Sequence, residues 1–101
     1  MQYNKLVRDK IPAIITKQGL TPITHVADAE EYYQKLKEKL QEEVEEFLKE
    51  SNEEELADIL EVIYSICEFK EIDKANLESR RLNKAEKRGG FRERVILEET
   101  R

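Results

Sequence analysis

The chain has 101 residues, of which 41% are charged and 39% apolar, with a net charge of −5, three Gly and two Pro. This length predicts one domain over residues 1–101, and the composition is typical of a mainly helical protein whose helices keep broad charged faces. Residues 28–61 hold 14 acidic residues and 4 lysines between basic flanks, which argues against a polymeric nucleic acid as the partner. The single Cys67 excludes an intrachain disulfide, and no apolar run is long enough for a signal peptide or a membrane span, so a cytoplasmic location is expected.

The N-terminal part is expected to be irregular and basic before its first helix. Apolar residues in 3–17 have nearly helical spacing, but Pro12 interrupts the pattern, because proline is tolerated in a first turn and breaks a helix interior. We therefore predict a short helix from about Ile11, with Gly19 as its C-terminal cap. The β-branched residues in 21–27 weakly favour a short strand.

Two helices are predicted in the acidic centre, over residues 29–50 and from Glu53 onward, with a polar break at 51–52. Asp28 is the expected N-cap of the first, with Glu31 as its capping-box partner. Each helix has an apolar face, formed by Tyr33, Leu36, Leu40, Val44, Phe47 and Leu48 on the first and by Leu56, Ile59, Leu60, Ile63, Ile66 and Cys67 on the second.

Five carboxylates lie on or beside these apolar faces: Glu42, Glu43 and Glu46 on the first helix, and Glu55 and Asp58 on the second. At helical spacing Glu43 points into the apolar stripe, whereas Glu45 lies on the opposite, solvent face. An acidic run that only improved solubility would not place a carboxylate among leucines.

The C-terminal part predicts one more helix, from near Asp73 to about Arg88, ended by Gly89 and Gly90. The tail over 91–97 alternates enough to form a strand, which could pair with residues 22–27 in a small two-stranded element.

Two interpretations of the carboxylates are open at this point. They could cap helices, complement helix dipoles or pair with nearby lysines, which explains most of them one by one. This explanation fits Glu43 least, because a carboxylate on an apolar face costs free energy unless it is compensated. A bound Mg²⁺ or Mn²⁺ would offset both that cost and the mutual repulsion of the carboxylates.

The ordered pattern EExxE followed by ExxD resembles the metal-binding signature of the MazG-like, all-α nucleoside triphosphate pyrophosphatases. It stands here as Glu42-Glu43-Val44-Glu45-Glu46 and Glu55-Leu56-Ala57-Asp58. The opening YNKLVRDKIP, the continuation LADILEVI and the closing KRGGF also resemble short MazG-like proteins, so the resemblance spans most of the chain. Eight residues separate Glu46 from Glu55, a shorter interval than in many relatives, so the hairpin loop is expected to be short.

The resemblance implies a mainly all-α, MazG-like helical bundle that is oligomeric, as a dimer or tetramer. It implies hydrolysis of a nucleoside triphosphate between the α- and β-phosphates, giving a monophosphate and pyrophosphate. Carried over by residue, Mg²⁺ (or Mn²⁺) would be held by Glu43, Glu46, Glu55 and Asp58. Glu42 and Glu43 would be the catalytic pair, with Glu42 as a further ligand or a water-orienting base. The phosphates would be bound by Arg8, Lys87 and Arg88.

Two alternatives accompany this interpretation. A phosphoribosyl-ATP pyrophosphohydrolase would use the same chemistry on a different nucleotide. A non-catalytic helical interaction module would use the acidic face to bind a basic partner, and it predicts no specific affinity for a metal ion.

Overall fold

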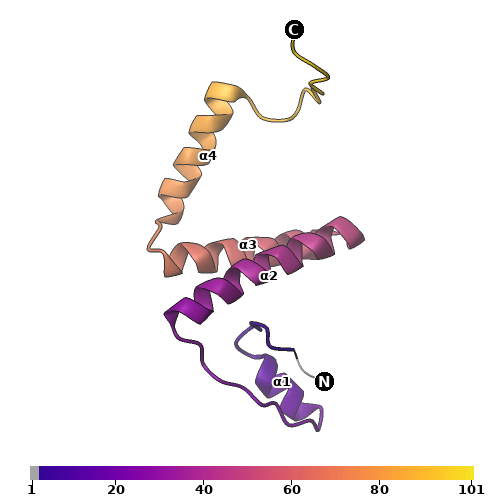
Figure 1. The fold of residues 1–101 in the computed structure, drawn as a ribbon, viewed down its shortest axis with the longest axis vertical. Helices are drawn as coiled ribbons and strands as arrows, with labels where there is room; N and C mark the ends of the chain where they lie inside the picture. Colours follow the sequence, from indigo (N-terminus) through magenta and orange to yellow (C-terminus); the bar gives the residue numbers. More distant parts are fainter. Residues whose placement is uncertain (1–2) are drawn as a thin grey trace.

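A computed structural model describes residues 3–101 as four helices, α1 (Ile11–Lys17), α2 (Ala29–Glu50), α3 (Glu53–Phe69) and α4 (Lys74–Arg88). The prediction of a mainly helical chain is thereby confirmed. Within the described residues the only extensive helix–helix packing joins α2 to α3, which lie side by side as a hairpin, while α4 projects away from them (Figure 1). No helix in residues 3–101 is both long enough and apolar enough to cross a membrane.

The ends of the helices follow local sequence signals. The side chains of the N-cap residues accept hydrogen bonds of 2.8 to 3.1 Å from backbone N–H groups of the first turns: Asp28 in α2, Asn52 in α3 and Asp73 in α4. Ser51 closes α2 in the left-handed conformation at a φ of 55°, so only two residues separate the helices of the hairpin. The predicted break and the predicted Asp28 N-cap are confirmed, as is Gly19 after α1 at a φ of 86°.

The possible strand pairing between 22–27 and 91–97 is not formed, since no strand occurs in residues 3–101. Residues 22–27 run as an extended connection from α1 to α2, and 91–97 follow α4 away from the hairpin (Figure 1). The two segments lie at opposite ends of the molecule, so neither provides the other with the backbone partner that a β-ladder requires.

The α2–α3 hairpin provides most of the core. Among the described residues the buried hydrophobic side chains are Leu36, Val62 and Cys67, and Leu36 is only 2% exposed. The predicted apolar face of α3 is therefore only partly correct: Val62 is buried although it was not assigned to that face, whereas Leu56 and Leu60 are 47% and 49% exposed. The N-terminal segment accounts for the Val62 part of this difference, because it lies along the α2–α3 pair and forms a pocket with Val62 in its wall.

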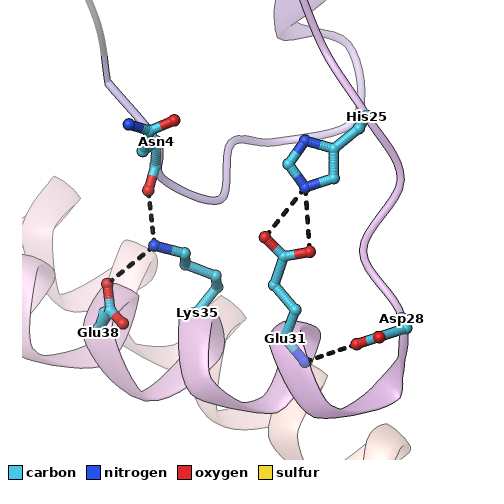
Figure 2. A network of polar contacts seen from close by, with 6 residues as sticks. All are labelled: Asn4, His25, Asp28, Glu31, Lys35 and Glu38. Carbon is cyan, nitrogen blue, oxygen red and sulfur yellow. Dashed lines mark hydrogen bonds and ion pairs between the residues drawn. The ribbon is translucent and has the colours of Figure 1, made fainter.

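Polar contacts fix the N-terminal segment and the α1–α2 connection to the start of α2. Figure 2 shows Lys35 on α2 donating a 2.7 Å hydrogen bond to the backbone carbonyl of Asn4. The same figure shows the Glu31 carboxylate 3.0 Å from Nε2 of His25. Glu31 therefore donates its backbone N–H to the Asp28 side chain, as the predicted capping box requires. Its carboxylate, which would contact the backbone N–H of Asp28 in a complete capping box, contacts His25 in the α1–α2 connection instead.

Candidate metal centre

Three carboxylates from the two hairpin helices converge near the α2–α3 connection. Glu43 of α2 and Glu55 and Asp58 of α3 each offer an oxygen, and these oxygens lie within 4.8 Å of one another. The arrangement follows from the short connection, which sets the C-terminal half of α2 beside the N-terminal half of α3. Ligand oxygens around Mg²⁺ lie about 3 to 4 Å apart, so small side-chain rotations would suffice to hold the ion.

Glu43 is the most enclosed of the three carboxylates. It is the only buried charged residue in the described part of the chain, with 9% of its surface exposed. Its compensating charge is Lys39, one turn earlier on α2, whose Nζ lies 3.3 Å from Oε1. Lys39 and Arg8, which pairs with Asp58, offset two of the three converging carboxylates, so the site stays negative. Hard oxygen donors of this kind suit a small divalent cation.

Glu42 lies beside the cluster between two lysines. Lys5 from the N-terminal segment approaches Oε1 at 3.0 Å, and Lys39 approaches the same atom at 3.5 Å. Partial desolvation would raise the pKa of Glu42, but the hydrogen bonds and charges of Lys5 and Lys39 together lower it below its ordinary value. Glu42 is therefore anionic at neutral pH.

The surroundings of Glu55 shift its pKa in the opposite direction to that of Glu42. Partial desolvation and then the negative charge of Asp58 raise the pKa of Glu55 above its ordinary value. The charges of Glu46 and Glu43 act in the same direction. The neighbouring carboxylates thus repel the negative charge of Glu55.

Glu55→Gln is expected to raise the thermal midpoint of the metal-free protein at pH 7, because it removes this repulsion. A folded-state pKa above the unfolded value contributes stability only at low pH, and that contribution is lost as the pH rises through the folded pKa. The advantage of the variant should therefore shrink on acidification to about pH 3, where the Glu55 carboxyl is protonated in both the folded and the unfolded state. Thermal unfolding in EDTA at the two pH values checks this, and a lower midpoint for the variant at pH 7 would contradict it.

The remaining predicted site residues are placed differently. Glu46 is exposed and lies outside the three-carboxylate group, although its charge is felt at Glu55. Arg8 reaches the cluster directly, with Nη2 2.7 Å from Oδ1 of Asp58. Lys87 and Arg88 are in the last turn of α4, at the end that points away from the hairpin, so one chain does not bring them to the carboxylates (Figure 1).

Lys39 was not among the predicted site residues, yet it contacts both Glu42 and Glu43. A signal was present in the sequence, since Lys39 precedes these glutamates by three and four residues and therefore shares their helix face. The contact of Lys5 with Glu42 spans 37 positions, and no local pattern predicts it.

Comparison with known proteins gave no match: no protein-family model, no curated protein and no solved structure matches this chain.

Proposed function

We propose that this protein is a Mg²⁺-dependent nucleoside triphosphate pyrophosphohydrolase that releases a nucleoside monophosphate and pyrophosphate. The observation that carries the proposal is the convergence of the Glu43, Glu55 and Asp58 oxygens within 4.8 Å. The burial of Glu43 supports it, because a helical surface that only improved solubility would leave its carboxylates in water. The resemblance of the EExxE and ExxD motifs to MazG-like enzymes supplies the reaction type.

In this proposal Glu43, Glu55 and Asp58 hold the cation, with Glu46 completing the set from the exposed side. Bound Mg²⁺ would neutralise charge on the phosphate oxygens and acidify a water molecule. Mn²⁺ could serve in the same way, since it also accepts oxygen ligands.

Glu42 is suited to orienting the attacking water. A general base works best when its pKa lies near the working pH, and Lys5 and Lys39 hold the pKa of Glu42 low. Glu42 would therefore accept a hydrogen bond from the water and align it. It would not be the general base that takes up the proton of the water.

Basic side chains from two parts of the fold would contact the substrate phosphates. Arg8 and Lys39 are the cations that line a pocket of about 300 Å³ between the N-terminal segment and the hairpin, whose wall also includes Asp9, Glu61 and Glu68. Lys87 and Arg88 would reach a site only from a second copy, because α4 points away from the hairpin of its own chain (Figure 1).

A homo-oligomer is part of the proposal. The radius of gyration is 18.0 Å, compared with about 13 Å for a compact chain of this length. Leu56 and Leu60 lie half exposed on α3, and a second hairpin would cover them. Sedimentation equilibrium should give a dimer or tetramer, and a monomer at micromolar concentration would contradict this part.

The experiment that tests the function is pyrophosphate release from a panel of standard and modified nucleoside triphosphates and phosphoribosyl-ATP, with Mg²⁺ and with EDTA. The best substrate would decide between a house-cleaning enzyme and a phosphoribosyl-ATP pyrophosphohydrolase. Folded protein that releases no pyrophosphate from any of them would contradict the proposal and favour a helical interaction module.

A further inference from the structure

The basic N-terminal segment contacts the carboxylates of the candidate metal centre. Arg8 donates from Nη2 to Oδ1 of Asp58 over 2.7 Å, and Lys5 donates from Nζ to Oε1 of Glu42 over 3.0 Å. Asp58 is at once the partner of Arg8 and one of the three converging carboxylates. A metal ion bound by Asp58 would therefore have to share this carboxylate with the Arg8 guanidinium.

This sharing is unfavourable. A divalent ion about 2 Å from an Asp58 oxygen would lie within about 5 Å of the Arg8 guanidinium, and like charges at that separation repel. The ion pair that Arg8 would give up is weak, because its side chain is 57% exposed and exposed ion pairs contribute little. Replacement of the Arg8 guanidinium by the metal ion at Asp58 would therefore cost little free energy.

The backbone around Arg8 is held on both sides, so the exchange needs only a side-chain rotation. Lys35 holds the carbonyl of Asn4, and the Arg8 carbonyl accepts the hydrogen bond of Ile11 N–H at the start of α1, over 3.0 Å. Arg8 also lines, with Lys39, the pocket of about 300 Å³, and the same wall carries the carboxylates of Asp9, Glu61 and Glu68. A guanidinium released from Asp58 thus stays beside a cavity, where it can bind phosphate through two parallel hydrogen bonds.

We propose that Arg8 is a built-in competitor for divalent metal at Asp58, and that metal binding transfers its guanidinium from this carboxylate to the phosphates of the nucleotide. This inference rests on the proposed function and adds an order to it: the metal binds first and prepares the phosphate site. Removal of Arg8 then has opposite effects on the two ligands, which loss of structure cannot produce, because damage to the fold weakens both.

The test is direct binding of Mn²⁺, followed by electron paramagnetic resonance, and of an ATP analogue with a methylene group between the α- and β-phosphorus atoms, followed by calorimetry. Arg8→Gln should tighten Mn²⁺ binding about two- to fivefold in the absence of nucleotide, the range that an exposed ion pair allows. In saturating Mn²⁺ it should weaken the analogue about tenfold or more, since a charged donor to phosphate is lost. Arg8→Lys, which keeps the charge, should hold Mn²⁺ much as the wild type does and still weaken the analogue, because lysine lacks the bidentate fork.

Arg81→Gln is the matched control, because it removes the same charge from another exposed Arg–carboxylate pair, that with Glu78 on α4. It should leave both affinities unchanged. This inference would be overturned if Arg8→Gln bound Mn²⁺ no more tightly than the wild type, or if its affinity for the analogue were unchanged. The proposed function would still stand in that case, provided that the wild type binds the metal. No Mn²⁺ binding by the folded wild type would overturn the proposed function and this inference with it.

Discussion

Glu43→Gln is expected to lower kcat/KM for metal-dependent pyrophosphate release by at least about 100-fold. Even the groups that only support metal ligands usually contribute about 10- to 100-fold, and Glu43 is the most enclosed carboxylate of the candidate centre. A neutral amide keeps the size of the side chain but removes the charge that would hold the cation. Steady-state kinetics over a range of Mg²⁺ concentrations measures the loss.

Glu45→Gln is the matched control for this prediction. Glu45 lies two positions further along α2, is exposed, and accepts a hydrogen bond from Gln41 at 3.1 Å. Its replacement changes the net charge by the same amount and should alter kcat/KM by less than about twofold, within the small effects usual for surface positions. If the two variants had equal activity, the assignment of Glu43 to the site would be wrong.

Leu36→Ala is expected to destabilise the protein by about 2 to 5 kcal/mol, the usual result of truncating a buried leucine. Leu36 is 2% exposed and packs in the core that joins α2 to α3. Each kcal/mol of destabilisation lowers the thermal midpoint of a domain of this size by about 4 to 8 °C, so the midpoint should fall by about 10 °C or more. Urea unfolding at a fixed protein concentration is the appropriate measurement, since an oligomer gains stability with concentration.

Leu20→Ala supplies the comparison for the core prediction. Leu20 follows α1 and is 65% exposed, so its truncation should change the free energy of unfolding by less than about 0.5 kcal/mol. Equal destabilisation by the two changes would show that the α2–α3 contact is not the main core. The candidate metal centre would then lack the rigid support that this structure gives it.

The fold was predictable where the signals are local. Asp28 and Asn52 begin helices because their side chains accept backbone hydrogen bonds, and a polar break separates the two long helices where Ser51 turns left-handed. The burial of Glu43 was predictable for the same reason, since helical periodicity places it within an apolar stripe.

The parts that were not predictable depend on contacts between distant segments. Val62 is buried because the N-terminal segment lies over its side of α3, which no helical period reveals. Arg8 meets Asp58 across 50 positions of the chain. The predicted strand over 91–97 had a suitable alternation, but alternation does not supply a partner, and no strand forms in residues 3–101.

Glu46 illustrates the same limit within the candidate centre. Its place in the EExxE motif assigned it to the metal, yet only Glu43 of that motif has an oxygen in the three-carboxylate group. Positions 43 and 46 are three residues apart on α2 and the charges of both raise the pKa of Glu55, but only Glu43 has an oxygen within 4.8 Å of oxygens of both Glu55 and Asp58. Motif spacing places both glutamates beside α3, and the packing of the helices decides how close each comes to Glu55 and Asp58.

The measurement that tests the central claim most directly is phosphorus NMR of the products formed by folded protein from the best nucleoside triphosphate. With Mg²⁺ present we predict equal amounts of nucleoside monophosphate and pyrophosphate, no orthophosphate, and no turnover in EDTA. A nucleoside diphosphate with orthophosphate, or the same products formed at the same rate without metal, would contradict the proposed pyrophosphohydrolase.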